Sequence, residues 1–278
     1  MSSNTLADPA AGRPDDEAAL LSRVTAIVQA AGDLLKDRFS TEPPEFGDRD
    51  DVVAAIHAND VAVLEVLRAP LLEARPGSRW VEDELDGGAL PPGEWWVVDP
   101  AEGNINHIHG TTDWGVTATL VRDNHPVLTV VHLPLVKTTY TAIAGGGAYQ
   151  DGVALRPSAK TSLDAALVGT GQARPGEDTE TLRRIGRSVT AMLLNGLVLQ
   201  VSVPATLQLI HVAAGRRDVF WQFSDVRSGL VAGALLVAEA GGVVTDVEGR
   251  PWNVASADLL AAAPGVHSAA VQVVSGTR

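Results

Sequence analysis

Residues 95–109 read Trp-Trp-Val-Val-Asp-Pro-Ala-Glu-Gly-Asn-Ile-Asn-His-Ile-His, an apolar run that ends in a turn with two carboxylates. The run predicts a buried strand that opens into a turn at Asp99, because a residue before proline is disfavoured in the helical conformation. Asp99 and Glu102 stand three residues apart across this turn, with Gly103 behind them, so both can point at one pair of metal ions. Taken singly, each acidic residue is better explained as a turn former.

Two further acidic groups stand at turn-like positions. One is Glu-Asp-Glu at residues 82–84, and the other is Asp225, just before a helix expected to begin near Ser228. Carboxylates at strand ends and helix starts supply the oxygen ligands that magnesium takes, with positions left for water and substrate. We therefore expect Asp99, Glu102 and Asp225 to converge on one metal shell, with ligand distances of about 2.0–2.1 Å.

The composition limits the classes of partner. The 278 residues are 45% hydrophobic, carry a net charge of −13 and include no cysteine. The acidity argues against nucleic acid as a partner, and the lack of cysteine excludes disulfides and thiolate metal sites. No apolar run approaches the roughly 20 residues that span a bilayer, so we expect no membrane association. Residues 1–16 lack an apolar signal core, which predicts a flexible leader and a cytoplasmic protein.

Apolar periodicity predicts helices and strands in both halves of the chain. Helices are expected at 17–39, 59–72, 178–187, 206–214 and 229–240, and strands at 95–98, 116–120, 127–132, 138–143, 167–169, 191–201, 243–245 and 259–262. Mixed elements throughout indicate stacked α and β layers. We divide the chain into the leader (1–16), an α+β half with the Asp-Pro-Ala-Glu-Gly motif (17–160) and an α/β half with Asp225 (161–278).

Together these motifs resemble the inositol monophosphatase family. The family signature reads Trp, two aliphatic residues, Asp-Pro, an aliphatic residue, Asp-Gly-Thr, then Asn, an aromatic residue and often His, which is similar to residues 96–107 here. Ala-Asn-Asp at 58–60 resembles the family's Ala-Thr-Asp, and Val-Glu-Asp-Glu at 81–84 its aliphatic-Gly-Glu-Glu. Residues 130–152 resemble its strand, hairpin and glycine-rich turn. Asp225 and Ala-Glu-Ala-Gly-Gly at 238–242 resemble its last metal ligand and the glycine pair beyond the following helix.

The resemblance implies an α/β layered sandwich of the αβαβα type and a phosphomonoesterase. Its reaction is attack by water activated on two or three Mg²⁺ ions, for which Mn²⁺ can substitute. The family's metal ligands fall on Asp83, Asp99, the carbonyl of Ala101, Glu102 and Asp225, and its water-activating pair on Asp60 and Asn104. On the substrate side stand Gly103, Asn104, His107, Trp221 and Arg227. A homodimer acting on a small anionic molecule is also implied.

The sequence departs from the family pattern at the metal site and at the water. Glu102 replaces Asp, and the added methylene moves the carboxylate by about 1 Å. Asp83 replaces Glu, and Glu82 is the alternative ligand. Asn104 replaces a Thr, and an amide can orient a water but cannot relay its proton. Restoring this residue, Asn104→Thr, is therefore expected to raise ester hydrolysis; the alternative is that Asn104 is simply a turn residue.

The substrate side also departs from the pattern. Val-Pro at 203–204 replaces Gly-Ser, and the aromatic residues Trp221 and Phe223 precede Asp225, which predicts a substrate that is larger and partly apolar. Arg227 beside a helix N-terminus favours an anionic group, with a surface salt bridge as the alternative.

His107 replaces an aromatic residue and begins the sequence His-Ile-His. Strand-like alternation would place two imidazoles on one face, and the alternative is a single polar residue lining a pocket.

Three functions follow from these departures. The first is a Mg²⁺-dependent phosphomonoesterase acting on a small, partly apolar metabolite. The second is a repurposed biosynthetic enzyme, in which the anion site assists elimination or cyclisation of a phosphate- or sulfate-bearing intermediate. The third is a catalytically silent family member. Metal affinity separates the third from the others, and turnover of phosphate esters separates the first from the second.

Overall fold

The computed structural model describes residues 14–82, 87–171 and 176–277. Its first sheet has seven strands in chain order, paired antiparallel except for the parallel pair β1–β2. The strands are β1 (Arg79–Trp80), β2 (Glu94–Glu102), β3 (Gly115–Arg122), β4 (His125–Leu133), β5 (Thr138–Ile143), β6 (Gly147–Gln150) and β7 (Val153–Ala154). Asp123 and Asn124 join β3 to β4 with φ of 48° and 68°, the left-handed pair that matches the twist of a tight hairpin.

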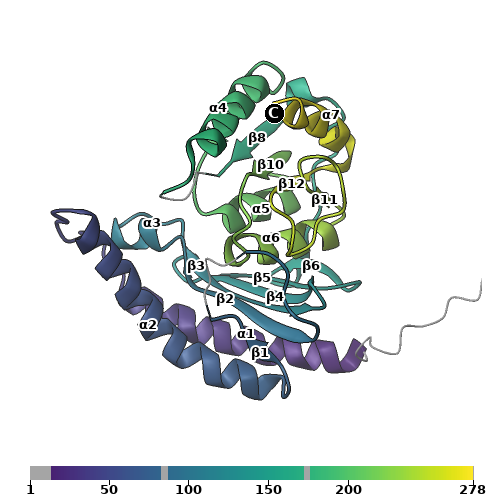
Figure 1. Ribbon diagram of the computed structural model, residues 1–278. Coiled ribbons are helices and arrows are strands. Elements are labelled where there is room, and N and C mark those ends of the chain that lie inside the picture. Colours follow the sequence, from purple (N-terminus) through teal and green to yellow (C-terminus); the bar gives the residue numbers. More distant parts are fainter. Residues whose placement is uncertain (1–13, 83–86, 172–175, 278) are drawn as a thin grey trace, which may run out of the picture.

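Helices α1 (Pro14–Asp37) and α2 (Arg49–Ala74) lie together on the outer face of this sheet (Figure 1). Apolar residues of α1 at three- and four-residue steps, from Leu20 to Leu35, are buried in one cluster with β3 and β4. By length and mean hydropathy (1.3), residues 16–37 would suffice to cross a membrane. The apolar stripe that gives this value is, however, covered by the protein's own sheet and by α2.

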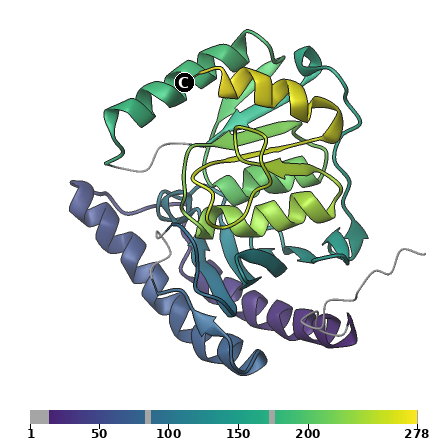
Figure 2. The ribbon, with the colours of Figure 1, turned by 45° about the vertical axis from the view of Figure 1, so that its right-hand side comes forward.

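The second sheet has five strands in the order β11-β12-β10-β8-β9. They are β8 (Leu167–Thr170), β9 (Val198–Val201), β10 (Val219–Gln222), β11 (Val243–Thr245) and β12 (Leu259–Ala262), with the 3-10 turn η1 (Leu163–Ala165) before β8. Helices α5 (Ala205–Ala213) and α6 (Ser228–Glu239) lie between the sheets, and α4 (Thr179–Leu193) and α7 (Pro264–Ser275) cover the far side (Figure 2). The order of layers is αβαβα, so the predicted fold is confirmed.

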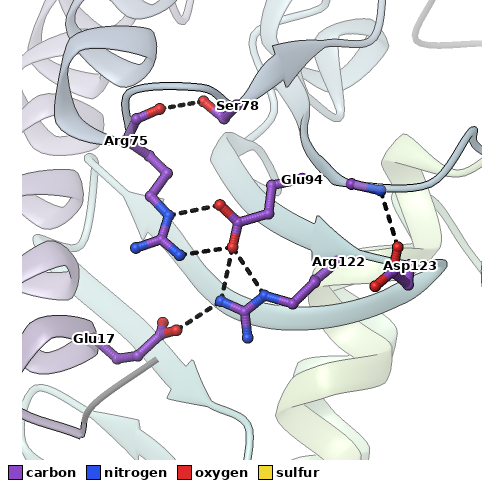
Figure 3. A network of polar contacts seen from close by, with 7 residues as sticks. Glu17, Arg75, Ser78, Glu94, Arg122 and Asp123 are labelled. Carbon is purple, nitrogen blue, oxygen red and sulfur yellow. Dashed lines mark hydrogen bonds and ion pairs between the residues drawn. The ribbon is translucent and has the colours of Figure 1, made fainter. Parts of the chain in front are cut away.

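An ion-pair network fastens the two outer helices to the first sheet (Figure 3). Glu94 on β2 accepts hydrogen bonds from Arg75 after α2 (2.6 Å to Nε) and from Arg122 on β3 (2.8 Å to Nε). Arg122 also reaches Glu17 on α1 at 2.8 Å. The hydrogen bonds from Arg75, against the effect of burial, hold the pKa of Glu94 below its usual value.

Several predicted boundaries are corrected. Helix α2 begins ten residues before the predicted start at 59, because Asp48 caps it by accepting from the amides of Asp50 and Asp51. The strand predicted at 191–201 is wrong up to residue 197, because α4 continues to Leu193 and only β9 is extended. Helix α7 was not predicted. The division at residue 160 stays a prediction, with the strands of the first sheet before it and those of the second after it.

Candidate active site

The Asp-Pro-Ala-Glu-Gly motif lies at the end of β2, where the pairing with β3 shifts register between Asp99 and Glu102. Gly103 then turns the chain with φ of 79° into the short helix α3 (Asn104–Ile108). A Cβ at Gly103 would lie 2.6 Å from the carbonyl oxygen of Asp113 and 3.0 Å from Cγ of Pro204. Glycine is therefore required for the turn, and the predicted Val-Pro segment at 203–204 does lie beside the motif.

Three carboxylates from two elements gather at this turn. Burial, then the negative charges of Glu102 on β2 and Asp60 on α2, raise the pKa of Asp99 well above its usual value. Burial likewise raises the pKa of Asp60 to about 6, although a hydrogen bond from Asn104 opposes this. The cluster therefore concentrates negative charge in a place where water screens it poorly.

Glu102 points toward the helices between the sheets. Its carboxylate is 3% exposed, and Oε2 accepts a hydrogen bond of 2.6 Å from the hydroxyl of Thr206 on α5. The same hydroxyl lies 3.1 Å from the carbonyl oxygen of Gly229 on α6. Sequence reasoning missed Thr206, because its role depends on the residues that it contacts, which the sequence of a mostly apolar helix does not show.

Asp225 lies in the loop before α6, next to the chain that follows residues 83–86. A Cβ at Gly87 would come within 2.3 Å of Asp225 Oδ2, so the two segments are in contact. Arg227 is buried and donates to the carbonyl oxygens of Gly87 and Gly88, the latter at 2.9 Å from Nε. These donors of Arg227 are therefore bound to backbone carbonyl groups. They bind neither an anion, as predicted, nor a carboxylate in a surface salt bridge, which was the alternative.

The predicted metal ligands are brought together only in part. Asp83 lies outside the described residues, and Glu82, its alternative, is exposed and paired with Arg68 on the surface. Within the described ranges, no three His, Asp or Glu side chains are set close enough to hold a metal ion by themselves. The convergence of Asp225 with Asp99 and Glu102 therefore stays a prediction.

The donor chemistry at the turn nevertheless fits a divalent cation. Asp99, Glu102 and Asp60 offer hard oxygen atoms, and their mutual repulsion at Asp99 is what a bound cation would relieve. A carboxylate has further lone pairs beyond the one that Glu102 gives to Thr206, so this hydrogen bond orients Glu102 without excluding it as a ligand.

His107 and His109 do not share a face, and the strand-like interpretation is wrong, because residues 104–108 form a helix. His107 is 4% exposed and its ring packs on Phe39 and Trp114, while His109 faces outward. Burial lowers the pKa of His107. The alternative interpretation is supported, since His107 lines a cavity of about 200 Å³ between α2 and residues 38–46.

The aromatic residues before Asp225 do not form an open wall. Trp221 on β10 is fully buried, and its Nε1 donates to the hydroxyl of Ser188 on α4 at 3.0 Å. Phe223 is also buried, beneath the guanidinium of Arg184. The expectation that Trp221 contacts substrate is corrected: β10 is a central strand, so this side chain belongs to the core between the second sheet and its outer helices.

Comparison with known proteins identifies the family. A model described as "Inositol monophosphatase family" matches residues 16–275. The chain belongs to this family. It is 31% identical over 270 residues to inositol-1-monophosphatase ImpA of Mycolicibacterium smegmatis, covering 92% of this chain and 94% of the relative. It is 33% identical over 193 residues to the Nus factor SuhB of Pseudomonas aeruginosa, covering 68% and 71%.

Solved structures agree with this assignment. Mycobacterium tuberculosis SuhB is 26% identical, with a TM-score of 0.75 over 94% of this chain and 99% of its own. An inositol monophosphatase from Zymomonas mobilis, 20% identical, shares the fold with a TM-score of 0.77 over 95% of this chain and all of its own. This member of the family is thus a phosphatase-type protein by descent.

Proposed function

We propose that this family member is a Mg²⁺-dependent phosphomonoesterase acting on a small, partly apolar metabolite. The observation that carries the proposal is the carboxylate cluster at the end of β2, in which Glu102 is buried and Asp60 and Asp99 are half-buried. Such a cluster is unfavourable unless a cation or a proton balances it. The apolar part of the substrate is assigned to the Val-Pro segment at 203–204, since Pro204 lies against Gly103.

The protein's own groups have distinct tasks in this proposal. Asp99, Glu102, the carbonyl of Ala101, Asp225 and Asp83 would hold the metal ions, which when bound lower the pKa of water and neutralise charge on the phosphoryl group. Asp60 accepts the proton of the attacking water, and Asn104 orients Asp60.

Release of inorganic phosphate from a panel of phosphate esters tests the proposal. Turnover should require Mg²⁺ or Mn²⁺, stop with a chelator, and fall by at least about 100-fold in Asp99→Asn. Fastest turnover with inositol monophosphate would refute the partly apolar substrate. No turnover of any ester, with Mg²⁺ bound, would refute hydrolysis itself and leave the repurposed biosynthetic role.

We further propose that the protein is a homodimer that pairs through the end of α4 and the edge strand β9. The large apolar side chains here are unusually exposed, with Leu194 at 81% and Leu197 at 62%. Val198 and Val201 on β9 are also exposed, and among the strands of the described residues β9 pairs only with β8. A clustered apolar surface beside an unpaired strand edge is typical of an interface between protein chains.

A further inference from the structure

Three of the residues that depart from the family pattern lie in one hydrogen-bonded cluster. Asn59 and Asn104 each replace a Thr and His107 replaces an aromatic residue, and all three are buried, at 5%, 8% and 4% exposed. Asn59 Nδ2 lies 2.9 Å from Asn104 Oδ1 and 3.0 Å from His107 Nδ1. Substitutions that are up to 48 positions apart in the sequence are thus directly in contact.

The direction of each hydrogen bond in this cluster is fixed by groups that cannot change roles. Arg38 Nε donates to Asn59 Oδ1 at 2.9 Å, and arginine is only a donor, so the Asn59 amide must present Nδ2 to its other partners. His107 Nε2 lies 2.9 Å from the carbonyl oxygen of Leu35, which is only an acceptor. His107 is therefore the Nε2–H tautomer, and its Nδ1 accepts from Asn59.

The same reasoning fixes Asn104. One N–H of its Nδ2 donates to the carbonyl oxygen of Ile56 at 3.0 Å, and the other donates to Asp60 Oδ1 at 2.7 Å. Both donors of Asn104 are therefore used, and its Oδ1 already accepts from Asn59. Among the described residues no donor hydrogen-bonds to Asp60 Oδ2, so this oxygen remains available to accept a proton.

From this geometry we propose that Asn59 and His107 are positioning residues, which fix the Asn104 amide and through it aim Asp60 Oδ2 at the attacking water. The inference rests on the proposed hydrolysis. In the step itself, an O–H bond of the water breaks and its proton passes to Asp60 Oδ2. The water oxygen bonds to phosphorus, the bond from phosphorus to the leaving oxygen breaks, and the leaving oxygen takes a proton from solvent.

The cluster reverses the expectation for Asn104→Thr. A threonine is shorter and has one donor, so it cannot serve both Ile56 and Asp60 and would leave Asn59 Nδ2 without its acceptor at Asn104. The single substitution should therefore lower turnover. Restoring all three family residues together, as Asn59→Thr, Asn104→Thr and His107→Phe, should recover at least part of it.

Asn59→Asp is the sharpest single test, because it keeps the size and the Arg38 partner but replaces the donor that faces Asn104 with an acceptor. We expect kcat for phosphate-ester hydrolysis to fall by about 10–100-fold, the usual effect of removing a group that orients a site residue, with KM changed less than about twofold. Asn253→Asp is the matched control, since Asn253 Oδ1 accepts from the amide of Ala255 and an aspartate keeps that bond.

A second measurement does not depend on turnover. The ¹⁵N signals of the His107 ring should show a protonated Nε2 and an unprotonated Nδ1 in the wild-type protein, and this pattern should change in Asn59→Asp. A wild-type ring protonated at Nδ1 would overturn the assigned directions.

The outcomes separate the two proposals. A wild type that binds Mg²⁺ yet hydrolyses no ester overturns the proposed function, and with it the catalytic use of the cluster. An active wild type whose kcat is unchanged in Asn59→Asp overturns the positioning role alone. The positioning role is also overturned if the triple variant is no more active than the product of the three single fold-changes predicts. That result would mean that the three sites act independently, because the free-energy effects of independent sites add.

Discussion

Thr206→Val tests whether the protein holds Glu102 as an ionised group. The two side chains have nearly the same shape, and Thr206 is fully buried, so the substitution removes a hydroxyl without opening a cavity. The Thr206 hydroxyl has one proton and two acceptors in reach, Glu102 Oε2 at 2.6 Å and the Gly229 carbonyl at 3.1 Å. The shorter bond, to a buried carboxylate, is the one that the substitution chiefly removes.

The magnitude follows from the charge of that acceptor. A hydrogen bond to a charged group contributes about 1.5–3 kcal/mol, and the acceptor that remains is 3% exposed, so water replaces the donor poorly. We expect a loss of about 2 kcal/mol in the free energy of unfolding. For a chain of 278 residues this corresponds to a fall in Tm of about 3–4 °C.

Urea unfolding without added metal, with Thr190→Val as the matched control, measures the effect. Thr190 is exposed and donates to the neutral carbonyl of Gly186 at 3.0 Å, so its loss should stay within about 0.5 kcal/mol. The affinity for Mg²⁺ should fall about 10–100-fold in Thr206→Val, because Glu102 loses the hydrogen bond from Thr206 that helps to orient it. Equal effects of the two substitutions would refute the assignment of Thr206 as the partner of a charged Glu102.

Three further predictions concern the metal, the pH and the assembly. Mg²⁺ should raise the Tm of the wild type but not the Tm of Asp99→Asn. In metal-free buffer the Tm of Asp99→Asn should match or exceed that of the wild type, because the repulsion with Glu102 is removed. A Tm gain with Mg²⁺ that is retained in the variant would contradict the metal assignment. Burial lowers the pKa of His132, so as the pH falls below about 6.5 the unfolded chain gains a proton that the folded chain does not. The free energy of unfolding should therefore decline between pH 7.5 and 5.5, and it should decline less steeply in His132→Gln. An unchanged slope in the variant would show that this histidine does not contribute to the pH dependence. In light scattering, Leu197→Glu should convert the dimer into a monomer. The control Val136→Glu should not, although Val136, on the β4–β5 turn, is as exposed as Leu197. A dimer that persists in Leu197→Glu would exclude this interface.

The fold was largely predictable because its strongest signals are local. The apolar stripe from Leu20 to Leu35 and the strands at 116–143 follow from periodicity and turn residues alone, and the structure confirms them. The errors lie where tertiary context decides. The apolar run at 191–201 can form either a helix end or a strand, and it forms both in turn.

The sequence was enough to predict which residues belong to the candidate site, but not which of them are in contact. The sequence singles out Asp60, Asp99 and Glu102, and in the structure the charges of Asp60 and Glu102 both act on Asp99, although among the described residues the three do not by themselves form a metal-binding group. It cannot show that Thr206, 104 positions away, is the partner of Glu102. Nor can it show that three scattered departures from the family pattern meet around Asn59, since each departure seen alone looks like an isolated loss.

The arrangement of α1 has a consequence for synthesis of the chain. This helix is complete at Asp37, but β4, against which it packs, ends only at Leu133, about 100 residues later. At about 5–20 residues per second, the apolar stripe leaves the ribosome roughly 5–20 s before its sheet exists. During that interval a helix of mean hydropathy 1.3 is open to any factor that binds apolar segments of nascent chains. The β3–β4 hairpin, which turns at Asp123 and Asn124, closes within about 1–10 μs, so the rate of translation sets how long this exposure lasts.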